Sequence, residues 1–199
     1  MDEAPRLRAA RPDDAPALAD LVNFAGEGLP LYLWGKMAEA GQSAWDVGRI
    51  RAGRDAGAFT WRNGFVAEQE GTGAACLMGY PLPETAPPID LAETPAMFVP
   101  LEEIERLAPG TWYVNVLASY PQWRGRGLGT LLLRHAEDLG AATGSRGCSI
   151  IVADSNTGGR RLYERCGYVE RARRAMIKDG WDGPGTEWVL LAKGQPATT

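Results

Sequence analysis

Side chains that build metal and redox sites are scarce in this sequence. Its 199 residues contain one histidine, His135, and three cysteines, Cys76, Cys148 and Cys166, with no CxxC pair among them. Zinc sites and disulfide frameworks need several such residues at regular spacing, so we expect no metal and no disulfide scaffold. Three cysteines cannot all pair, which favours a reducing compartment, and we expect all three to be small core fillers.

Excess positive charge and long apolar runs are also missing. The formal net charge is −4, which argues against a general binder of nucleic acids or of anionic membranes. No apolar run approaches the length of a membrane span, and the N-terminal MDEAPRLRAA carries acid where a signal peptide has basic and apolar parts. We therefore predict a cytoplasmic protein with no nucleic-acid partner and no membrane partner.

The apolar fraction of 45% is enough for one well-formed core. Between about 81 and 109 the chain changes character, because repeated prolines there forbid regular strand pairing. We predict a single domain over 1–199 with a Pro-rich insertion at about 81–109, which contains a short helix at 101–107. The insertion could be a flap, an interface segment or a tolerated surface excursion, and the sequence leaves its role open.

The most informative stretch runs from Trp112 to Leu139. Its β-branched and aromatic content predicts a largely covered strand up to Ser119, and leucines at helical spacing predict a helix from Leu128 onward. Between them, glycines at every second position over 125–129 let the backbone turn tightly and bring successive N–H groups towards a ligand. The start of the helix directs its unpaired N–H groups to the same place, so the pattern predicts a phosphate site.

Two familiar phosphate loops do not fit this pattern. A dinucleotide fingerprint needs GxGxxG, whereas the glycines stand at 125, 127 and 129. A P-loop needs a lysine before its Ser or Thr, but Gly129 is followed directly by Thr130. A strand-to-helix turn that is merely rich in glycine remains the alternative on this segment alone.

As written, Arg124-x-x-Gly127-x-Gly129 after an apolar strand resembles motif A of the GNAT superfamily, the acetyl-CoA-dependent N-acyltransferases. The rest of that family's pattern follows downstream in the same order and spacing: an apolar strand at 149–153, then Asn156, the pair Leu162–Tyr163, and Gly167–Tyr168. The resemblance is specific from about Thr111 to Val169 and only general outside that range.

The resemblance implies an α/β (α+β) fold with a mixed, mostly antiparallel central sheet of about six to seven strands, flanked by helices and splayed at the cofactor strand. The rest of the sequence supplies matching elements. Its patterning predicts strands over 6–10, 63–69, 74–80, 168–177 and 188–192, and helices through 18–24, 31–38 and 43–50. A hairpin turn is expected at 70–73.

By resemblance, the loop binds the diphosphate of acetyl-CoA or coenzyme A, which acts as co-substrate. Backbone N–H groups and the Arg124 and Arg126 side chains would hold the phosphates, while the peptide-like arm pairs with the exposed end of the cofactor strand. Ser119 replaces a residue that is often branched and apolar in the family, which leaves its main-chain role intact. The implied cofactor-binding residues are Leu117, Ala118, Ser119, Arg124, Gly125, Arg126, Gly127, Leu128, Gly129, Thr130 and Asn156.

Tyr163 is the catalytic residue that the resemblance implies, because its phenol would meet the departing thiolate. With a phenol pKa near ~10 and a thiol pKa near ~8.5, full proton transfer is uphill by about 1.5 units, so hydrogen bonding can contribute as much. The alternative is a tyrosine that only packs beside the sulfur. Asn156 would hold the arm or a bridging water, and its alternative is an ordinary helix N-cap. Both of these roles are compatible with each other.

The resemblance places Glu27, Tyr32 and Trp34 in one wall of the acceptor site. The alternative is that the two aromatic residues belong to the core and that Glu27 is a solvated loop residue. No acid lies between Trp112 and Arg126, so the general base is either Glu27 or a chain of waters. The spacing of His135 along its helix indicates a packing residue.

The expected reaction is direct attack by a primary amine, of a small molecule or a peptide, on the acetyl group of acetyl-CoA. Two alternatives are a non-catalytic acyl-CoA-binding sensor of the same fold, which would not need Tyr163, and a nucleotide-binding module that ignores the pantetheine arm. The identity of the acceptor, the acyl preference beyond acetyl and the formation of a homodimer are left open.

Overall fold

The computed structural model describes residues 4–194. In that range the strands form a seven-stranded sheet with the order β1-β2-β3-β4-β5-β7-β6. The β4–β5 pair is parallel, whereas β1–β2, β2–β3, β5–β7 and β6–β7 are antiparallel. The predicted mixed, mostly antiparallel sheet with flanking helices is therefore confirmed. Its strands are β1 (Arg6–Ala9), β2 (Gly64–Gln69), β3 (Thr72–Pro81), β4 (Trp112–Ser119), β5 (Gly147–Ala153), β6 (Val169–Ala175) and β7 (Glu187–Gly194).

The chain forms two compact units. Among the described residues, unit 1 comprises 4–79 and 116–132, and unit 2 comprises 80–115 and 133–194. Both β4 and helix α5 (Leu128–Ala142) continue from one unit into the other. Unit 1 carries the glycine loop and the helices after β1, and unit 2 carries the Pro-rich insertion and Tyr163.

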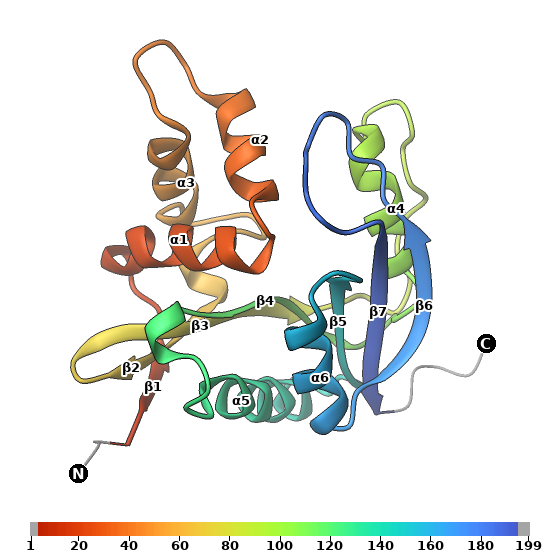
Figure 1. Cartoon of the computed structure of the whole chain (residues 1–199). Helices are drawn as coiled ribbons and strands as arrows, with labels where there is room; N and C mark the ends of the chain where they lie inside the picture. The colour runs from red at the N-terminus through yellow and green to blue at the C-terminus, as the bar shows by residue number, and fades with distance from the viewer. Residues whose placement is uncertain (1–3, 195–199) are drawn as a thin grey trace. The chain divides into compact units, whose positions relative to one another are not determined.

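In unit 1, helices α1 (Ala15–Ala25), α2 (Leu29–Met37) and α3 (Ala44–Ala52) lie on one face of the β2–β3 hairpin (Figure 1). Helix residues such as Leu18 and Leu21 share a core there with Val66 and Met78 of the strands. The hairpin turn is tighter than expected, since β3 already begins at Thr72. Its two central residues, Glu70 and Gly71, have φ angles of 52° and 73°, as a two-residue hairpin turn of the right twist requires.

Polar side chains fix the ends of these helices. The Asp14 carboxylate accepts from the Arg11 backbone N–H at 2.7 Å and pairs with Arg8 at 2.7 Å, in a short 3-10 turn that precedes α1. Ser43 caps α3 by accepting from the Asp46 N–H at 3.2 Å, and the Asp46 side chain accepts from the Ser43 N–H in return. The start of α3 thus follows from the sequence.

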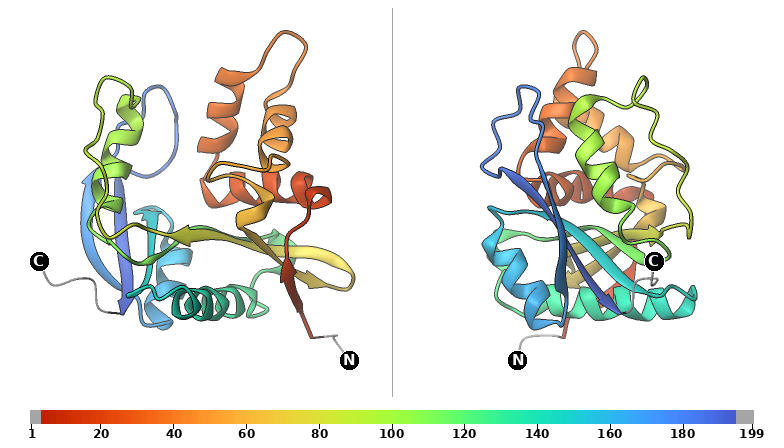
Figure 2. Two further views of the ribbon diagram at one scale, coloured as in Figure 1. Left: turned by 180° about the vertical axis from the view of Figure 1, so that it is seen from behind. Right: turned by 90° about the vertical axis from the view of Figure 1, so that its right-hand side faces the viewer.

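In unit 2, α4 (Val99–Glu105) covers one face of the β5–β7–β6 part of the sheet, and α6 (Thr157–Arg165) lies on the other (Figures 1 and 2). Ile104 and Leu190 meet beneath α4 without exposure. The parallel pairing of β4 with β5 runs from Trp112 to Val114, and within the described residues Asn115 has no partner on β5. The end of this pairing agrees with the predicted splay.

The two ends of the Pro-rich insertion are held together by backbone hydrogen bonds. The N–H of Leu82 donates to the Thr111 carbonyl at 2.8 Å, and the N–H of Gly110 donates to the Pro83 carbonyl at 3.2 Å. Its helix begins two residues before the predicted start, because Pro100 fits the first turn of a helix, where its missing N–H costs nothing. A cavity of about 500 Å³ is lined by residues 82–87 together with Glu102, Glu105 and Arg106 at the end of α4.

Asp154, at the end of β5, holds the loop between β6 and β7. Its carboxylate accepts from the Thr186 N–H at 2.8 Å, the Thr186 hydroxyl at 2.7 Å and the Ser155 N–H at 3.0 Å. In the same loop, Trp181 stacks on Trp188 with ring centroids 6.3 Å apart. Burial raises the pKa of Asp154, but the hydrogen bonds from Thr186 and its neighbours outweigh it and hold the pKa at about 2.

Replacing Asp154 with alanine is expected to lower Tm by about 3–6 °C at pH 7, because its charge-assisted hydrogen bonds contribute about 1–2 kcal/mol at a half-exposed site. A depressed carboxyl pKa stabilises the fold above the unfolded pKa near ~4, and this stability is lost as the pH falls through about 2. Thermal unfolding at pH 7 and pH 3, followed by circular dichroism, measures both effects. Asp154→Asn is the control, because it keeps one acceptor oxygen and should lose only the pH-dependent part; equal Tm values for all three proteins would contradict the assignment.

Candidate active site

The glycine loop before α5 forms an open concave turn in unit 1. Gly125 and Gly127 have φ angles of 76° and 81°, in the left-handed region that glycine adopts without strain. A Cβ placed on either residue would meet no atom within 4 Å, so the space above the turn is open. Alternating left-handed residues of this kind point successive N–H groups towards one side, which makes an anion-binding concavity.

The N–H groups of this turn are available for a ligand. The first hydrogen bond into α5 runs from the Leu131 N–H to the Gly127 carbonyl at 3.0 Å. Within residues 4–194, no protein group accepts a hydrogen bond from the backbone N–H of Gly125 through Thr130. Because helix N-termini carry a partial positive charge, N–H groups in such an arrangement can bind a phosphate or pyrophosphate.

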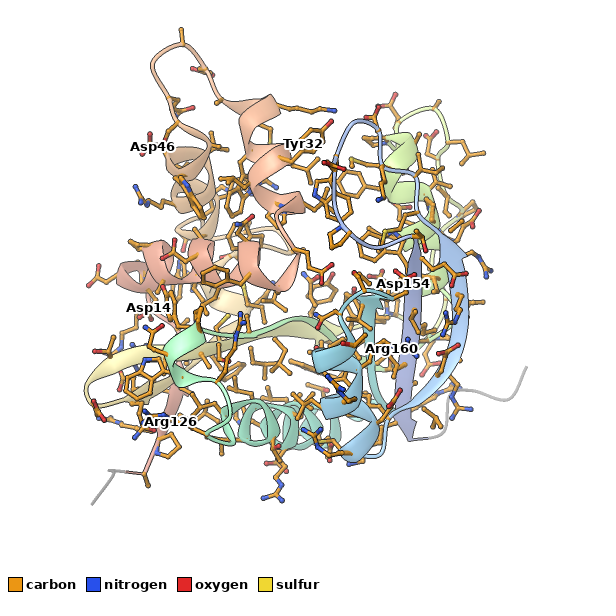
Figure 3. All side chains as sticks on the ribbon, in the orientation of Figure 1. Asp14, Tyr32, Asp46, Arg126, Asp154 and Arg160 are labelled. Carbon is orange, nitrogen blue, oxygen red and sulfur yellow. The ribbon has the colours of Figure 1, made fainter. Side chains whose placement is uncertain are left out.

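Two arginines flank the turn and stay on the surface. Arg126 stacks on the Trp123 ring at 4.7 Å, and Figure 3 shows it on the loop that leads into α5. The Arg124 Nε donates to the Ser119 carbonyl at 3.4 Å, at the end of β4. Neither arginine forms an ion pair with a carboxylate in the described residues. Both guanidinium groups can therefore give charge-assisted bonds to an anion.

The predicted acceptor-wall residues of unit 1 fall into two groups. Glu27 lies in the turn between α1 and α2 with φ 51°, and Tyr32 is half-buried on α2 with the Lys36 ammonium 4.5 Å from its ring centroid (Figure 3). Trp34 is 3% exposed and stacks on Phe59 at 5.6 Å. It is thus a core residue, as in the alternative interpretation, and we do not include it in the acceptor wall.

Tyr163 and Asn156 both belong to α6 in unit 2. Tyr163 is 4% exposed, its ring centroid lies 6.3 Å from that of Tyr168, and burial raises its pKa above the usual value. Asn156 is the N-cap of α6, since its Oδ1 accepts from the Gly159 N–H at 2.9 Å. A Cβ on Gly159 would approach that oxygen to 2.9 Å, which explains a glycine in the first helical turn.

The remaining candidate groups have structural environments. His135 is half-buried on α5, where burial lowers its pKa. Cys76 and Cys148 are buried as predicted, whereas Cys166 is half-exposed at the end of α6, so the prediction that all three fill the core was wrong for that residue. In the described part of the chain, no three His, Cys, Asp or Glu side chains gather as a metal site requires. No helix within residues 4–194 is both long and apolar enough for a membrane span.

Comparison with known families identifies the family to which a chain with this glycine loop and this helix belongs. The sequence profile of the acetyltransferase (GNAT) family matches residues 34–168, a range that contains β4, the glycine loop and α6. This chain belongs to the GNAT family. The resemblance inferred from the two motifs is confirmed, and the family assignment makes the protein an acyltransferase.

Solved structures share the GNAT fold at low sequence identity. An N-acetyltransferase from Staphylococcus aureus Mu50 is 20% identical, with a TM-score of 0.63 over 94% of this chain and 100% of its own. The ribosomal-protein-S18-alanine N-acetyltransferase from Escherichia coli is 17% identical, with a TM-score of 0.57 over 98% and 97%. A GNAT acetyltransferase from Elizabethkingia anophelis with bound acetyl-CoA is 17% identical, with a TM-score of 0.50 over 66% and 75%. No curated protein matches the chain.

The sequence motifs did not identify Tyr120 as a candidate site residue. In this GNAT chain it lies between the end of β4 and the glycine loop. Its hydroxyl donates to the Asp20 carboxylate of α1 at 2.9 Å. The two residues are 100 positions apart in the sequence, and neither belongs to a recognisable pattern. Only the packing of α1 against the strands brings them together.

Proposed function

We propose that this GNAT protein transfers an acetyl group from acetyl-CoA to a primary amine of a small molecule or a peptide. The observation that carries the proposal is the open turn over 125–130: its N–H groups have no acceptor among the described residues, and a Cβ on Gly125 or Gly127 would meet no atom within 4 Å. Neighbours of the same fold include a structure with bound acetyl-CoA and an N-acetyltransferase that is named for an amine acceptor.

The residues present fit such a ligand in chemistry and in order along the chain. The N–H groups from Gly125 to Thr130 would hold its pyrophosphate, with Arg124 and Arg126 adding charge-assisted bonds. The backbone of Leu117 to Ser119, after pairing of β4 with β5 has ended, would bind the amide-bearing arm. Bound acetyl-CoA supplies the thioester that a neutral amine attacks.

By the family pattern, Tyr163 is the group that stabilises the departing thiolate. Burial raises the pKa of this tyrosine above its ordinary value of about 10. The hydroxyl therefore stays protonated and can donate a hydrogen bond, but it is a weak acid that does not readily transfer its proton. We infer that it acts mainly by donating a hydrogen bond. Asn156 already caps α6 through Oδ1, which leaves its amide N–H groups as possible donors to the arm.

The attacking amine must lose a proton. We propose that Glu27, or a chain of waters, takes up this proton. Glu27 sits in the turn that leads from α1 into α2, together with Tyr32 as the remaining wall candidate. We also propose a cytoplasmic location, which three free cysteines support. A homodimer remains compatible with these features, and we propose no nucleic-acid or membrane partner on the basis of the −4 charge.

Release of free thiol from acetyl-CoA across a panel of amines tests the function directly. We expect at least one primary amine, among amino acids, polyamines, aminoglycosides and peptide N-termini, to give saturable thiol release with stoichiometric N-acetylated product by mass spectrometry. Binding of acetyl-CoA with no turnover for any amine would favour the non-catalytic sensor. Equal affinity for coenzyme A and for 3′-phosphoadenosine 5′-phosphate would favour a nucleotide-binding module.

A further inference from the structure

Tyr120 is fixed at three points in unit 1. Its backbone N–H donates to the Ala74 carbonyl of β3 at 3.0 Å, and its hydroxyl donates to the Asp20 Oδ2 of α1 at 2.9 Å. Its ring also meets the Phe24 ring edge-on, with centroids 5.9 Å apart. One residue therefore links a strand, the end of β4 and a helix.

On one side of Tyr120 lies the segment that we assign to the cofactor. Leu117 to Ser119 precede it directly, and Arg124, which donates to the Ser119 carbonyl at 3.4 Å, follows it by one turn. Cys76 of β3 is fully buried in the core of unit 1, and burial raises the pKa of its thiol to about 12. The segment that we assign to the arm thus ends directly at Tyr120.

On the other side of Tyr120 lies the proposed acceptor wall. The same helix that carries Asp20 carries Asn23, whose Oδ1 accepts from the Leu31 N–H at 3.0 Å and whose carbonyl accepts from the Gly28 N–H at 3.1 Å. These bonds fix the turn that holds Glu27 and set the start of α2. A shift of α1 would therefore move the turn and α2 together.

The link between the two sides is a strong and persistent hydrogen bond. A hydroxyl that donates to a carboxylate forms a charge-assisted bond, and both Tyr120 and Asp20 are half-buried, which limits competition from water. Burial, followed by the neighbouring Asp20 carboxylate, raises the pKa of Tyr120, so its hydroxyl keeps the proton over the whole working range of pH.

We propose that Tyr120 is a positioning residue that couples the acceptor wall of α1 and α2 to the cofactor-binding end of β4. The inference rests on the proposed function, because it assigns β4 to the cofactor and the α1–α2 turn to the acceptor. Occupation of the strand end restricts Tyr120, and through Asp20 and Asn23 it also restricts the wall. Each ligand then raises the affinity for the other by the same factor, as linkage requires.

The test compares coupling in matched variants of the full chain. Calorimetry gives the Kd of coenzyme A with and without a saturating concentration of the best amine from the thiol-release panel. We expect wild type to bind coenzyme A about fivefold more tightly with the amine present, and Tyr120→Phe to reduce this factor to about one. The KM for the amine should rise about fivefold in Tyr120→Phe, while kcat stays within about twofold.

Variants of Asp20 separate the hydrogen bond from general packing. Asp20→Asn keeps an acceptor oxygen and should retain the wild-type coupling, whereas Asp20→Ala should match Tyr120→Phe. The double variant should lose nothing further, because both changes remove one bond. Tyr113→Phe, which removes a tyrosine hydroxyl from β4, should leave the coupling unchanged.

Two results would overturn this inference in distinguishable ways. If wild type shows neither coenzyme A binding nor thiol release, the proposed function fails and takes the inference with it. If wild type binds and turns over while Tyr120→Phe keeps the full coupling factor, only the inference fails. A Tyr120→Phe protein with a lower Tm but unchanged coupling would likewise reduce Tyr120 to a purely structural residue.

Discussion

Replacing Gly127 with valine is expected to weaken coenzyme A binding by about a hundredfold or more. Gly127 has a φ of 81°, and a β-branched residue there is strained by about 1–2 kcal/mol or more, so the backbone would rotate and turn its N–H groups away from the ligand. Hydrogen bonds to a charged group are worth about 1.5 kcal/mol or more each, so the loss of two accounts for a hundredfold change. Calorimetry with coenzyme A measures this directly.

Two further variants control for the loss of a glycine as such. Gly127→Asn should retain much of the affinity, because asparagine tolerates the left-handed region better than other side chains. Gly158→Ala adds a methyl group in the first turn of α6, where it meets no atom within 4 Å, and should raise the free energy of unfolding by up to about 1 kcal/mol without changing affinity. Wild-type affinity in Gly127→Val would show that this turn does not hold the phosphates.

The parts of the fold that are determined by neighbouring residues could be predicted from the sequence. Alternate glycines after an apolar strand gave the loop before α5, and the helix predicted from 43 is capped by Ser43 and begins at Ala44, because a turn or a cap depends on residues within a few positions. The order of the two motifs then gave the family and its sheet. The prediction that Cys166 fills the core was wrong for a related reason. Residues near Cys166 in the sequence do not show whether the end of its helix is covered by other parts of the chain.

At the candidate site, only the backbone conformation of the glycine loop could be predicted from the sequence. An aromatic residue at helical spacing looks the same in a core and in a substrate wall, so Trp34 could be assigned to the core only once its contact with Phe59 was known. The Asp20–Tyr120 bond joins residues that no local pattern connects. The conformation of the glycine loop is thus encoded locally, whereas the link from Tyr120 to α1 is a property of tertiary packing.

Tyr163→Phe is expected to lower kcat by about a hundredfold while the Kd of coenzyme A stays within about twofold. Acid catalysis by a positioned side chain contributes about a hundred- to ten-thousandfold, and we expect the lower end, because burial raises the pKa of Tyr163 and makes full proton transfer to a thiolate still less favourable. Steady-state thiol release and calorimetry give the two quantities. Tyr168→Phe is the matched control, because Tyr168 is 2% exposed and its ring centroid lies 6.3 Å from that of Tyr163.

The pH dependence provides an independent check on Tyr163. A raised pKa keeps the phenol protonated as the pH increases to 10, so deprotonation of Tyr163 cannot reduce the rate in that range. The wild-type rate should instead rise with pH as the acceptor amine loses its proton, and Tyr163→Phe should show the same profile at a lower level. A wild-type rate that falls between pH 8 and 10, with the fall absent from Tyr163→Phe, would mean that the hydroxyl titrates there, and the hydrogen-bonding role would have to be replaced by full proton transfer.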